Sequence, residues 1–546
     1  MMNLLFLFSV AFAISIVIIP LAARIAPRVG LLDMPDARKV HVQPVPRVGG
    51  WGIALGSLVP LAVVLGGDPL LRSFVLGSLV LFLFGIWDDA RNTNHWVKFG
   101  GQALAAACVV YLGDLYVARI PFLDLTLPEQ IGRPFTVFAL IGVINAVNHS
   151  DGLDGLAGGE SMLSLIAFAL LGYLSGSPLV LGVAMAAMGG VLGFLRYNSY
   201  PARVFMGDCG SQALGFTLGF LAVYLTQVAS AAVSAVLPLL LIGMPIADIL
   251  SVLYLRIHGR MHWFRASRNH VHHRLLQRGF QHSETVVVIY AMQTLLVISG
   301  VVLRFQSDVM LALLYIGIVG GLFSALAVAE GRGWSVRRGA LSELPVLRAL
   351  WALRHEPRWR EVPARVVGFL TPAVIVAGAL WTARVPRDIG IAAGVLGLVG
   401  LAAALALRAS TPLHSLTVRV TAYMATVFSA YLCIFFPGEL QEPVRWAGLA
   451  IMAILAASIA IYIRYTAERP FGTSPTDYLI ILGVIALVVF GRGHADAHRT
   501  VELMVYSIVV LYGCEVIVER DREHRALHWA ATVALLVMFA RSVLRG

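Results

Sequence analysis

The sequence predicts an all-α, polytopic integral membrane protein, a bundle of about eighteen transmembrane helices. Of its 546 residues, 59% are hydrophobic and 13% are charged, whereas a soluble domain carries about a quarter charged residues. Runs of roughly 17 to 25 apolar residues recur along the chain, and each is long enough to cross a hydrocarbon core of about 30 Å as a helix. The lipid bilayer is therefore the expected environment of the chain.

The formal net charge is +11, and the arginines gather in the loops between apolar runs. This distribution follows the positive-inside rule of membrane proteins and gives no reason to expect nucleic acid as a partner. The four cysteines show no CxxC spacing, so neither a zinc cluster nor a disulfide framework is predicted. The first apolar run, residues 4–23, has its arginines after it, and we expect a retained span whose amino end faces outward.

Composition divides the chain into three expected segments. Residues 1–330 form a first membrane domain of about eleven spans. Residues 331–365 contain eight arginines and are expected to form a basic cytoplasmic linker. Residues 366–546 return to apolar runs and form a C-terminal membrane extension of about seven spans, for which the sequence indicates no function.

Charge bias also predicts which loops share a side of the membrane. The segment 24–47 carries five Lys and Arg residues and is assigned to the cytoplasm. Alternation of the later spans then brings four polar loops to the same face, including the most basic one. These loops are residues 87–98, 148–159, 196–211 and 256–282.

Asp88 and Asp89 stand at the cytoplasmic end of a predicted span. Neighbouring residues in a helix point about 100° apart, so different roles are expected, one carboxylate toward a cation and the other toward a loop or substrate. The alternative is a solvated helix end. Lys98, nine residues further on, is a further cationic candidate, or a lysine that only reaches for the membrane surface.

The stretch "NHSDGLDGLAGG", residues 148–159, holds two aspartates three residues apart among four glycines. Asn148, Asp151 and Asp154 share one helical face if the turn continues into the next helix. Oxygen ligands of this kind suit Mg²⁺, which takes one or two protein oxygens and completes its shell with water and phosphate. In "MGDCGS", Asp208 also stands between glycines immediately before a predicted span and is a further candidate oxygen ligand. A helix N-cap is the alternative.

The stretch "HVHHRL", residues 270–275, lies in a loop segment with six arginines, six histidines and no carboxylate. Such surroundings are electrostatically poor for zinc, whereas arginine and histidine donors suit phosphate oxygens. Recognition of phosphate or sugar is therefore favoured over a metal site or a loop that only sets topology. Asp248 lies inside a predicted span, where an acid is a functional candidate by default and a structural partner otherwise.

Acids that hold Mg²⁺ and face a basic loop at the membrane surface suit a reaction between a soluble phosphate compound and a lipid phosphate. Five motifs, in this order, resemble the polyprenyl-phosphate N-acetylhexosamine-1-phosphate transferase family, a group of glycosyltransferase family 4. The resemblance covers about residues 1–330 and identifies that segment as a membrane-embedded phosphoglycosyl transferase domain. The motifs are "DMPDARKVHVQPVPRVGG", "GIWDDARNTNHWVKFGGQ", "INAVNHSDGLDGLAGG", "FMGDCGSQALGF" and "HVHHRLLQRG".

The resemblance implies transfer of an N-acetylhexosamine 1-phosphate, foremost GlcNAc 1-phosphate, from a UDP-sugar to polyprenyl (undecaprenyl) phosphate, with release of UMP. It implies Mg²⁺, or Mn²⁺ in its place, as the cofactor, and an active site at the cytoplasmic face of the plasma (inner) membrane. The implied reaction starts a lipid-linked envelope glycan such as O-antigen. A homodimer is one implied assembly. The implied roles are Asp88 and Asp89 near the lipid phosphate, Asn148 and Asp208 as metal ligands, Asp151 and Asp154 at the nucleotide-sugar end, Lys98 on phosphate, and His270, His272, His273 and Arg274 on the sugar phosphate.

Two features depart from the family pattern. Many relatives have an acid before the histidine motif, where this chain has Ser267 in "ASRNH", so the identity of the sugar stays open. The C-terminal extension has no counterpart from which a role can be transferred.

Two mechanisms and one rival function also stay open. Direct attack by the lipid phosphate is favoured because this nucleophile is already ionised at pH 7, and the other route makes Asp151 or Asp88 a covalent nucleophile. The rival is a secondary transporter of an anionic substrate, which only the intramembrane Asp248 favours.

Overall fold

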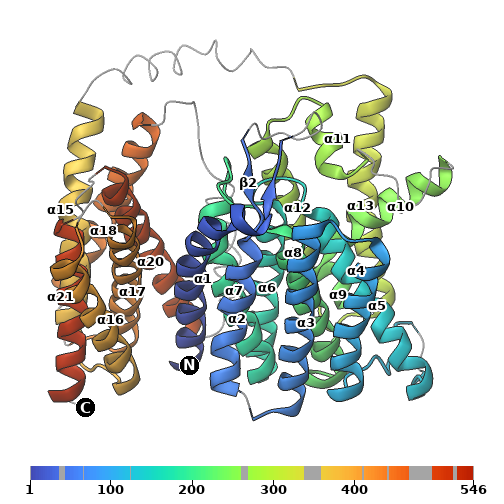
Figure 1. Cartoon of the computed structure of the whole chain (residues 1–546), viewed down its shortest axis with the longest axis horizontal. Helices are drawn as coiled ribbons and strands as arrows, with labels where there is room; N and C mark the ends of the chain where they lie inside the picture. Colours follow the sequence, from blue (N-terminus) through green and yellow to red (C-terminus); the bar gives the residue numbers. More distant parts are fainter. Residues whose placement is uncertain are drawn as a thin grey trace. The chain divides into compact units, whose positions relative to one another are not determined.

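The computed structural model describes most of the chain as helices connected by short loops (Figure 1). The chain divides into two compact units, whose described residues are those up to 336 and those from 358 onward. The residues that the structure describes are 2–35, 43–65, 67–122, 125–259, 269–336, 358–408, 411–438, 442–466, 495–520 and 525–544.

The first unit is an all-α bundle with one small hairpin. Its helices are α1 (Met2–Val29), α2 (Gly49–Leu65), α3 (Pro69–Arg91), α4 (His95–Ala107), α5 (Glu129–Ser150), α6 (Leu156–Leu174), α7 (Pro178–Asn198), α8 (Gly207–Tyr224), α9 (Leu237–Leu241), α10 (Gly243–His258), α11 (Val271–Gln277), α12 (His282–Val302) and α13 (Asp308–Gly331). Short π-helical turns extend two of them, η1 (Cys108–Leu112) after α4 and η2 (Leu225–Ala229) after α8.

The second unit contains six helices among its described residues, and several glycines and small polar side chains lie between them. They are α15 (Arg358–Trp381), α16 (Arg387–Ala406), α17 (Pro412–Phe435), α18 (Glu442–Thr466), α20 (Ala495–Arg520) and α21 (Arg525–Leu544). Small residues let helices approach closely where lipid supplies no hydrophobic force between them.

Twelve helices in the described part of the chain are long and apolar enough to cross a membrane, and three shorter apolar helices accompany them. The all-α membrane fold is therefore confirmed, while the predicted total of about eighteen spans is not reached in these residues. One predicted span, residues 233–255, is interrupted. α9 ends at Leu241 and α10 begins at Gly243 with Pro245 in its first turn, because proline supplies no amide for a continuous helix.

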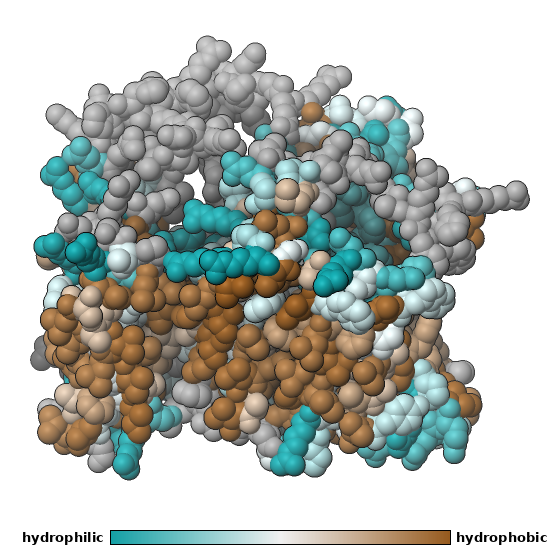
Figure 2. Space-filling model, in the orientation of Figure 1, coloured by the Kyte–Doolittle hydropathy of each residue, from teal (hydrophilic) through white to brown (hydrophobic). Residues whose placement is uncertain are grey.

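Large apolar side chains cover the outside of the helices, as expected for surfaces that face lipid. Val63, Leu83, Phe138 and Leu313 in the first unit are each at least 64% exposed. Figure 2 shows hydrophobic residues over the middle of the helices in each unit and hydrophilic residues toward the helix ends. This banding identifies the chain as a multi-pass membrane protein.

A two-stranded antiparallel hairpin, β1 (Leu32–Asp33) and β2 (Val45–Pro46), connects α1 to α2. The segment after β2 pairs with the segment before α8, since Phe205 donates its amide to Pro46 O at 2.8 Å and Gly49 donates to Phe205 O at 2.9 Å. The start of α2 and the start of α8 are thereby fixed side by side at one end of the unit.

Candidate active site at one end of the first unit

α3 ends in a turn that holds Asp88. Asn92 adopts a left-handed conformation with φ of 47° and stops the helix. The chain then turns so that the Thr93 amide donates to Asp88 Oδ1 at 2.9 Å. The other Asp88 oxygen lies 2.7 Å from Nζ of Lys98 in the first turn of α4. Asp88 is buried and engaged on both carboxylate oxygens.

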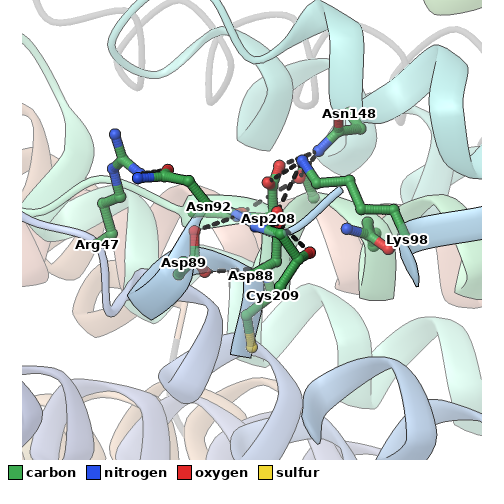
Figure 3. Close-up of polar contacts among 12 residues, drawn as sticks. Arg47, Asp88, Asp89, Asn92, Lys98, Asn148, Asp208 and Cys209 are labelled. Carbon is green, nitrogen blue, oxygen red and sulfur yellow. Dashed lines mark hydrogen bonds and ion pairs between the residues drawn. The ribbon is translucent and has the colours of Figure 1, made fainter. Parts of the chain in front are cut away.

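Lys98 joins the end of α3 to the start of α8. Its Nζ lies 2.6 Å from Asp208 Oδ2 (Figure 3). Asp208 Oδ1 in turn accepts a hydrogen bond from Asn148 Nδ2 at 2.6 Å, and the same amide nitrogen lies 2.7 Å from Ser211 Oγ. One ammonium, two carboxylates and one amide from α3, α4, α5 and α8 therefore form a single polar cluster.

Asp89 makes different contacts from its neighbour Asp88. Its Oδ1 accepts from the backbone amide of Asp208 at 2.9 Å, and its Oδ2 accepts from the amide of Cys209 at 3.1 Å. These are amides of the first turn of α8, which have no partner inside their own helix. Asp89 therefore caps α8 from another helix, where the positive end of the helix dipole favours a carboxylate.

Glycines allow α2, α3 and α8 to meet at this point. A Cβ on Gly50 would lie 2.3 Å from Gly210 N, and a Cβ on Gly85 would lie 2.4 Å from Cys209 Cα. Gly207 has φ of 71°, and a Cβ there would lie 2.6 Å from Asp89 Oδ2. The glycines of "MGDCGS" are therefore required for close backbone approach and for a left-handed turn.

The turn between α5 and α6 carries Asp151 and Asp154 in different surroundings. Asp154 Oδ2 accepts from the Ala202 amide at 2.9 Å, and its own amide donates to Nε2 of His282 at 3.1 Å. Asp151 is half-buried, and its side chain has no hydrogen bond or ion pair to the residues that the structure describes. Burial, then the negative charges of Asp208 and Asp154, raise the pKa of Asp151 to about 7.

The histidine motif folds as the short helix α11, and Asp248 of α10 holds its beginning. Asp248 Oδ2 lies 2.7 Å from His270 Nδ1, and Asp248 Oδ1 accepts from the Val271 amide at 2.8 Å. Because a carboxylate accepts, this contact places the His270 proton on Nδ1. The residue that the sequence marked as a functional or structural acid thus orients the motif.

His272 joins α11 to the aspartate turn. A Cβ on Gly152 would lie 2.2 Å from His272 Nε2, so the imidazole rests directly on the backbone between Asp151 and Asp154. Burial and the neighbouring His273, whose ring centroid is 4.3 Å away, lower the pKa of His272 to about 3. His272 is therefore uncharged near pH 7 and can donate one hydrogen bond and accept another.

Arg274, expected on the sugar phosphate, pairs with Glu330 near the end of α13. Arg274 Nε lies 2.8 Å from Glu330 Oε1, and Arg274 Nη2 lies 3.0 Å from Glu330 Oε2. Its guanidinium carbon lies 5.7 Å from the ring centroid of Phe323, also in α13. Ser267 lies outside the described residues.

The structure brings the predicted residues into two adjoining groups. Four, Lys98 included, form the Lys98 cluster. In the other group, Gly152 between Asp151 and Asp154 lies against His272 of α11, and Asp154 contacts His282 at the start of α12. Sequence reasoning missed several partners that complete these groups, because Thr93 and Ser211 are uncharged residues inside the motifs, and Glu330 and Asn198 stand in no motif. They are Thr93 beside Asp88, Ser211 beside Asn148, Glu330 beside Arg274, and Asn198, which accepts from the Gly155 amide at 2.8 Å.

The donor atoms of the cluster fit a hard divalent cation. Asp88 Oδ2 and Asp208 Oδ2 lie 2.7 and 2.6 Å from one nitrogen atom of Lys98, so they converge on a point where a small cation would reach both. Asn148 offers Asp208 its amide nitrogen, and a role as metal ligand requires its oxygen. In the described residues no group of three or more His, Cys, Asp and Glu side chains has a metal-binding arrangement, and Mg²⁺ needs only one or two carboxylates.

Comparisons with known proteins agree with this geometry. The model of the family described as "Glycosyl transferase family 4" matches residues 71–226, from the first turn of α3 into η2. The "Probable undecaprenyl-phosphate N-acetylglucosaminyl 1-phosphate transferase" of Bacillus subtilis (strain 168) is 33% identical over 309 residues, which are 56% of this chain and 86% of that protein. The "Undecaprenyl-phosphate alpha-N-acetylglucosaminyl 1-phosphate transferase" of Escherichia coli (strain K12) is 29% identical over 52% of this chain and 80% of that protein.

A third relative, the protein of that same name from Yersinia pestis, is 29% identical over 61% of this chain and 92% of its own length. The sequence resemblance is therefore confirmed: the chain belongs to glycosyl transferase family 4 and is a phosphotransferase.

Proposed function

We propose that the chain transfers a sugar 1-phosphate from a UDP-sugar to undecaprenyl phosphate and releases UMP. N-acetylglucosamine 1-phosphate is the proposed group, and the reaction starts a lipid-linked glycan at the cytoplasmic face of the plasma membrane. The single observation that carries the proposal is the Asp88–Lys98–Asp208 cluster, which faces the Asp151 turn and the histidine helix at the same end of the first unit. The names of the relatives support the same acceptor and the same sugar.

The chemical obstacle is repulsion between two phosphates. At an effective dielectric constant of about 20, each pair of unit negative charges about 4 Å apart costs roughly 4 kcal/mol, which corresponds to about a thousandfold in rate. A lipid phosphate monoester has its second pKa near 6, so it is already ionised at pH 7 and needs no strong base. The site must therefore supply positive charge and position more than proton transfer.

Each group of residues meets one part of this requirement. Asp88, Asp208 and Asn148 would hold Mg²⁺, which would neutralise phosphate oxygens when bound. The Lys98 ammonium lies between the same two carboxylates, so Mg²⁺ would take its place there and Lys98 would be free to contact the phosphates. Asp89 fixes the backbone at the start of α8 and so keeps Asp208 in place.

The donor side is formed by the aspartate turn and α11. Neutral His272 and the neighbouring His270 and His273 present hydrogen-bond donors and acceptors to the sugar phosphate, and Asp154 holds the turn through Ala202. An oxygen of the lipid phosphate forms a bond to the sugar-bearing phosphorus. The bond from that phosphorus to the bridging oxygen breaks, and UMP leaves with the electron pair.

One observation bears on the covalent alternative. Both oxygens of Asp88 and of Asp89 accept hydrogen bonds or an ion pair, whereas Asp151 has no such contact with the described residues. An aspartyl-phosphate intermediate would thus form at Asp151. Direct attack remains our proposal, and the transporter alternative loses its support because Asp248 is engaged with the start of α11.

Lipid-dependent release of UMP tests the proposal. Purified full-length protein in detergent is incubated with UDP-N-acetylglucosamine, undecaprenyl phosphate and Mg²⁺, and the matched control omits the lipid. We expect UMP only in the complete mixture. UMP release that does not need lipid, or no release with any UDP-sugar of a panel, would refute the transferase assignment.

A further inference from the structure

A carboxylate from a neighbouring helix holds each end of α11, which carries the histidine motif. At its beginning, Asp248 of α10 contacts the His270 ring and the Val271 amide at 2.7 and 2.8 Å. Near its end, Glu330 of α13 forms two contacts with Arg274 at 2.8 and 3.0 Å. These two carboxylates fix a helix of seven residues, which is too short to be stable alone.

The Arg274 guanidinium is neutralised and covered by residues of α13. Its side chain is 12% exposed, and its two contacts with Glu330 form the parallel, bidentate arrangement that suits a guanidinium and a carboxylate. The aromatic ring beneath it, Phe323, belongs to the same helix as Glu330. A guanidinium that is neutralised and stacked in this way contributes little net charge to a substrate phosphate.

The position of α11 matters because the His272 ring is packed tightly against the aspartate turn. Any Cβ at Gly152 would overlap its Nε2 at 2.2 Å, so a shift of the helix changes the distance between the imidazole and the turn directly. Misplacement by about 1 Å in a catalytic site can reduce a rate about a hundredfold.

We infer that Glu330 is a positioning residue of the donor site, and that Arg274 acts on the substrate through its ion pair with Glu330 rather than by contact with phosphate. This inference rests on the proposed function, since it takes α11 as the donor side. A role through the ion pair and a role in phosphate binding predict opposite effects when the charge of Glu330 is removed. If Arg274 binds phosphate, removal of the Glu330 charge frees it and leaves donor use unchanged or improved.

The test compares Glu330→Gln, Arg274→Gln and the reversed pair Arg274→Glu with Glu330→Arg in the full chain. Arg332→Gln is the matched control, because Arg332 is an exposed residue two positions after Glu330. Steady-state kinetics give kcat and KM for UDP-N-acetylglucosamine and KM for the lipid phosphate. Hydrogen exchange of the peptide that contains α11 gives a readout that does not depend on activity.

We expect Glu330→Gln and Arg274→Gln each to lower kcat/KM for the donor about tenfold or more, with KM for the lipid unchanged and faster amide exchange in α11. The reversed pair is expected to restore slow exchange and to bring donor kcat/KM within about threefold of wild type. Arg332→Gln is expected to change neither readout.

Wild-type donor kinetics in Glu330→Gln, together with an inactive Arg274→Gln, would overturn the inference. A reversed pair that restores slow exchange but stays inactive would do the same, because it would show that a positive charge is needed at position 274 itself. Failure of the wild-type protein to release UMP would instead refute the proposed function, and the exchange data would still report on the ion pair.

Discussion

Asp89→Asn separates a capping role for this residue from direct contact with substrate. Asparagine keeps one acceptor oxygen but places an amide nitrogen where a carboxylate oxygen now accepts from Asp208 or Cys209. One buried amide then faces a donor, which costs about 1–3 kcal/mol, and the lost charge at the start of α8 costs up to about 2 kcal/mol more. We therefore expect a loss of stability of about 1–5 kcal/mol.

The same substitution is expected to lower kcat about a hundredfold. One of the displaced amides belongs to Asp208 itself, so the Asp208 carboxylate would move with it. Thermal unfolding in detergent, followed by tryptophan fluorescence, measures the stability, and UMP release measures kcat. Asp89→Ala, which removes both acceptors, should unfold at a still lower temperature. An Asp89→Asn protein with the wild-type unfolding temperature and no turnover would refute the capping role and would indicate that Asp89 contacts the substrate.

Asp208→Asn is expected to lower kcat about a thousandfold and to weaken Mn²⁺ binding, measured by electron paramagnetic resonance, while the protein stays folded. Unchanged Mn²⁺ affinity would remove Asp208 from the cation site. Gly152→Ala places a Cβ against His272 and should raise KM for the UDP-sugar and not for the lipid, and a KM effect on the lipid alone would contradict the placement. The pKa of Asp151, about 7, predicts that its ionised fraction rises from about a tenth at pH 6 to about nine-tenths at pH 8. If the ionised form is active, kcat/KM rises with pH in the wild type and this limb is absent in Asp151→Asn, whereas an identical limb in both proteins would exclude Asp151.

The sequence predicts the membrane fold well because apolar length is a local property of the chain. It also predicts that four polar loops share one end, since alternation of spans follows from counting them. The break between α9 and α10 is harder to predict, because Pro245 lies in a long, mostly apolar stretch and proline is tolerated in many membrane helices.

Side-chain roles within the site are less accessible from the sequence. Asp88 and Asp89 are adjacent and look equivalent, yet one contacts Lys98 and the other caps α8. That difference depends on where α3 ends relative to the start of α8, which no local pattern encodes. Glu330 lies 56 residues from Arg274 near the end of an apolar helix, so its role becomes visible only when α13 packs beside α11.

We propose that a sugar 1-phosphate, and not the sugar alone, passes to the lipid phosphate at this cluster. UDP-N-acetylglucosamine labelled with ³²P at either the α or the β phosphorus, incubated with the full-length protein, Mg²⁺ and undecaprenyl phosphate, tests it directly. We predict that the β label appears in the lipid product and the α label in UMP. Neither labelled product is expected with Asp208→Asn. Release of the β label as UDP, or labelled lipid at the wild-type rate in Asp208→Asn, would contradict the account.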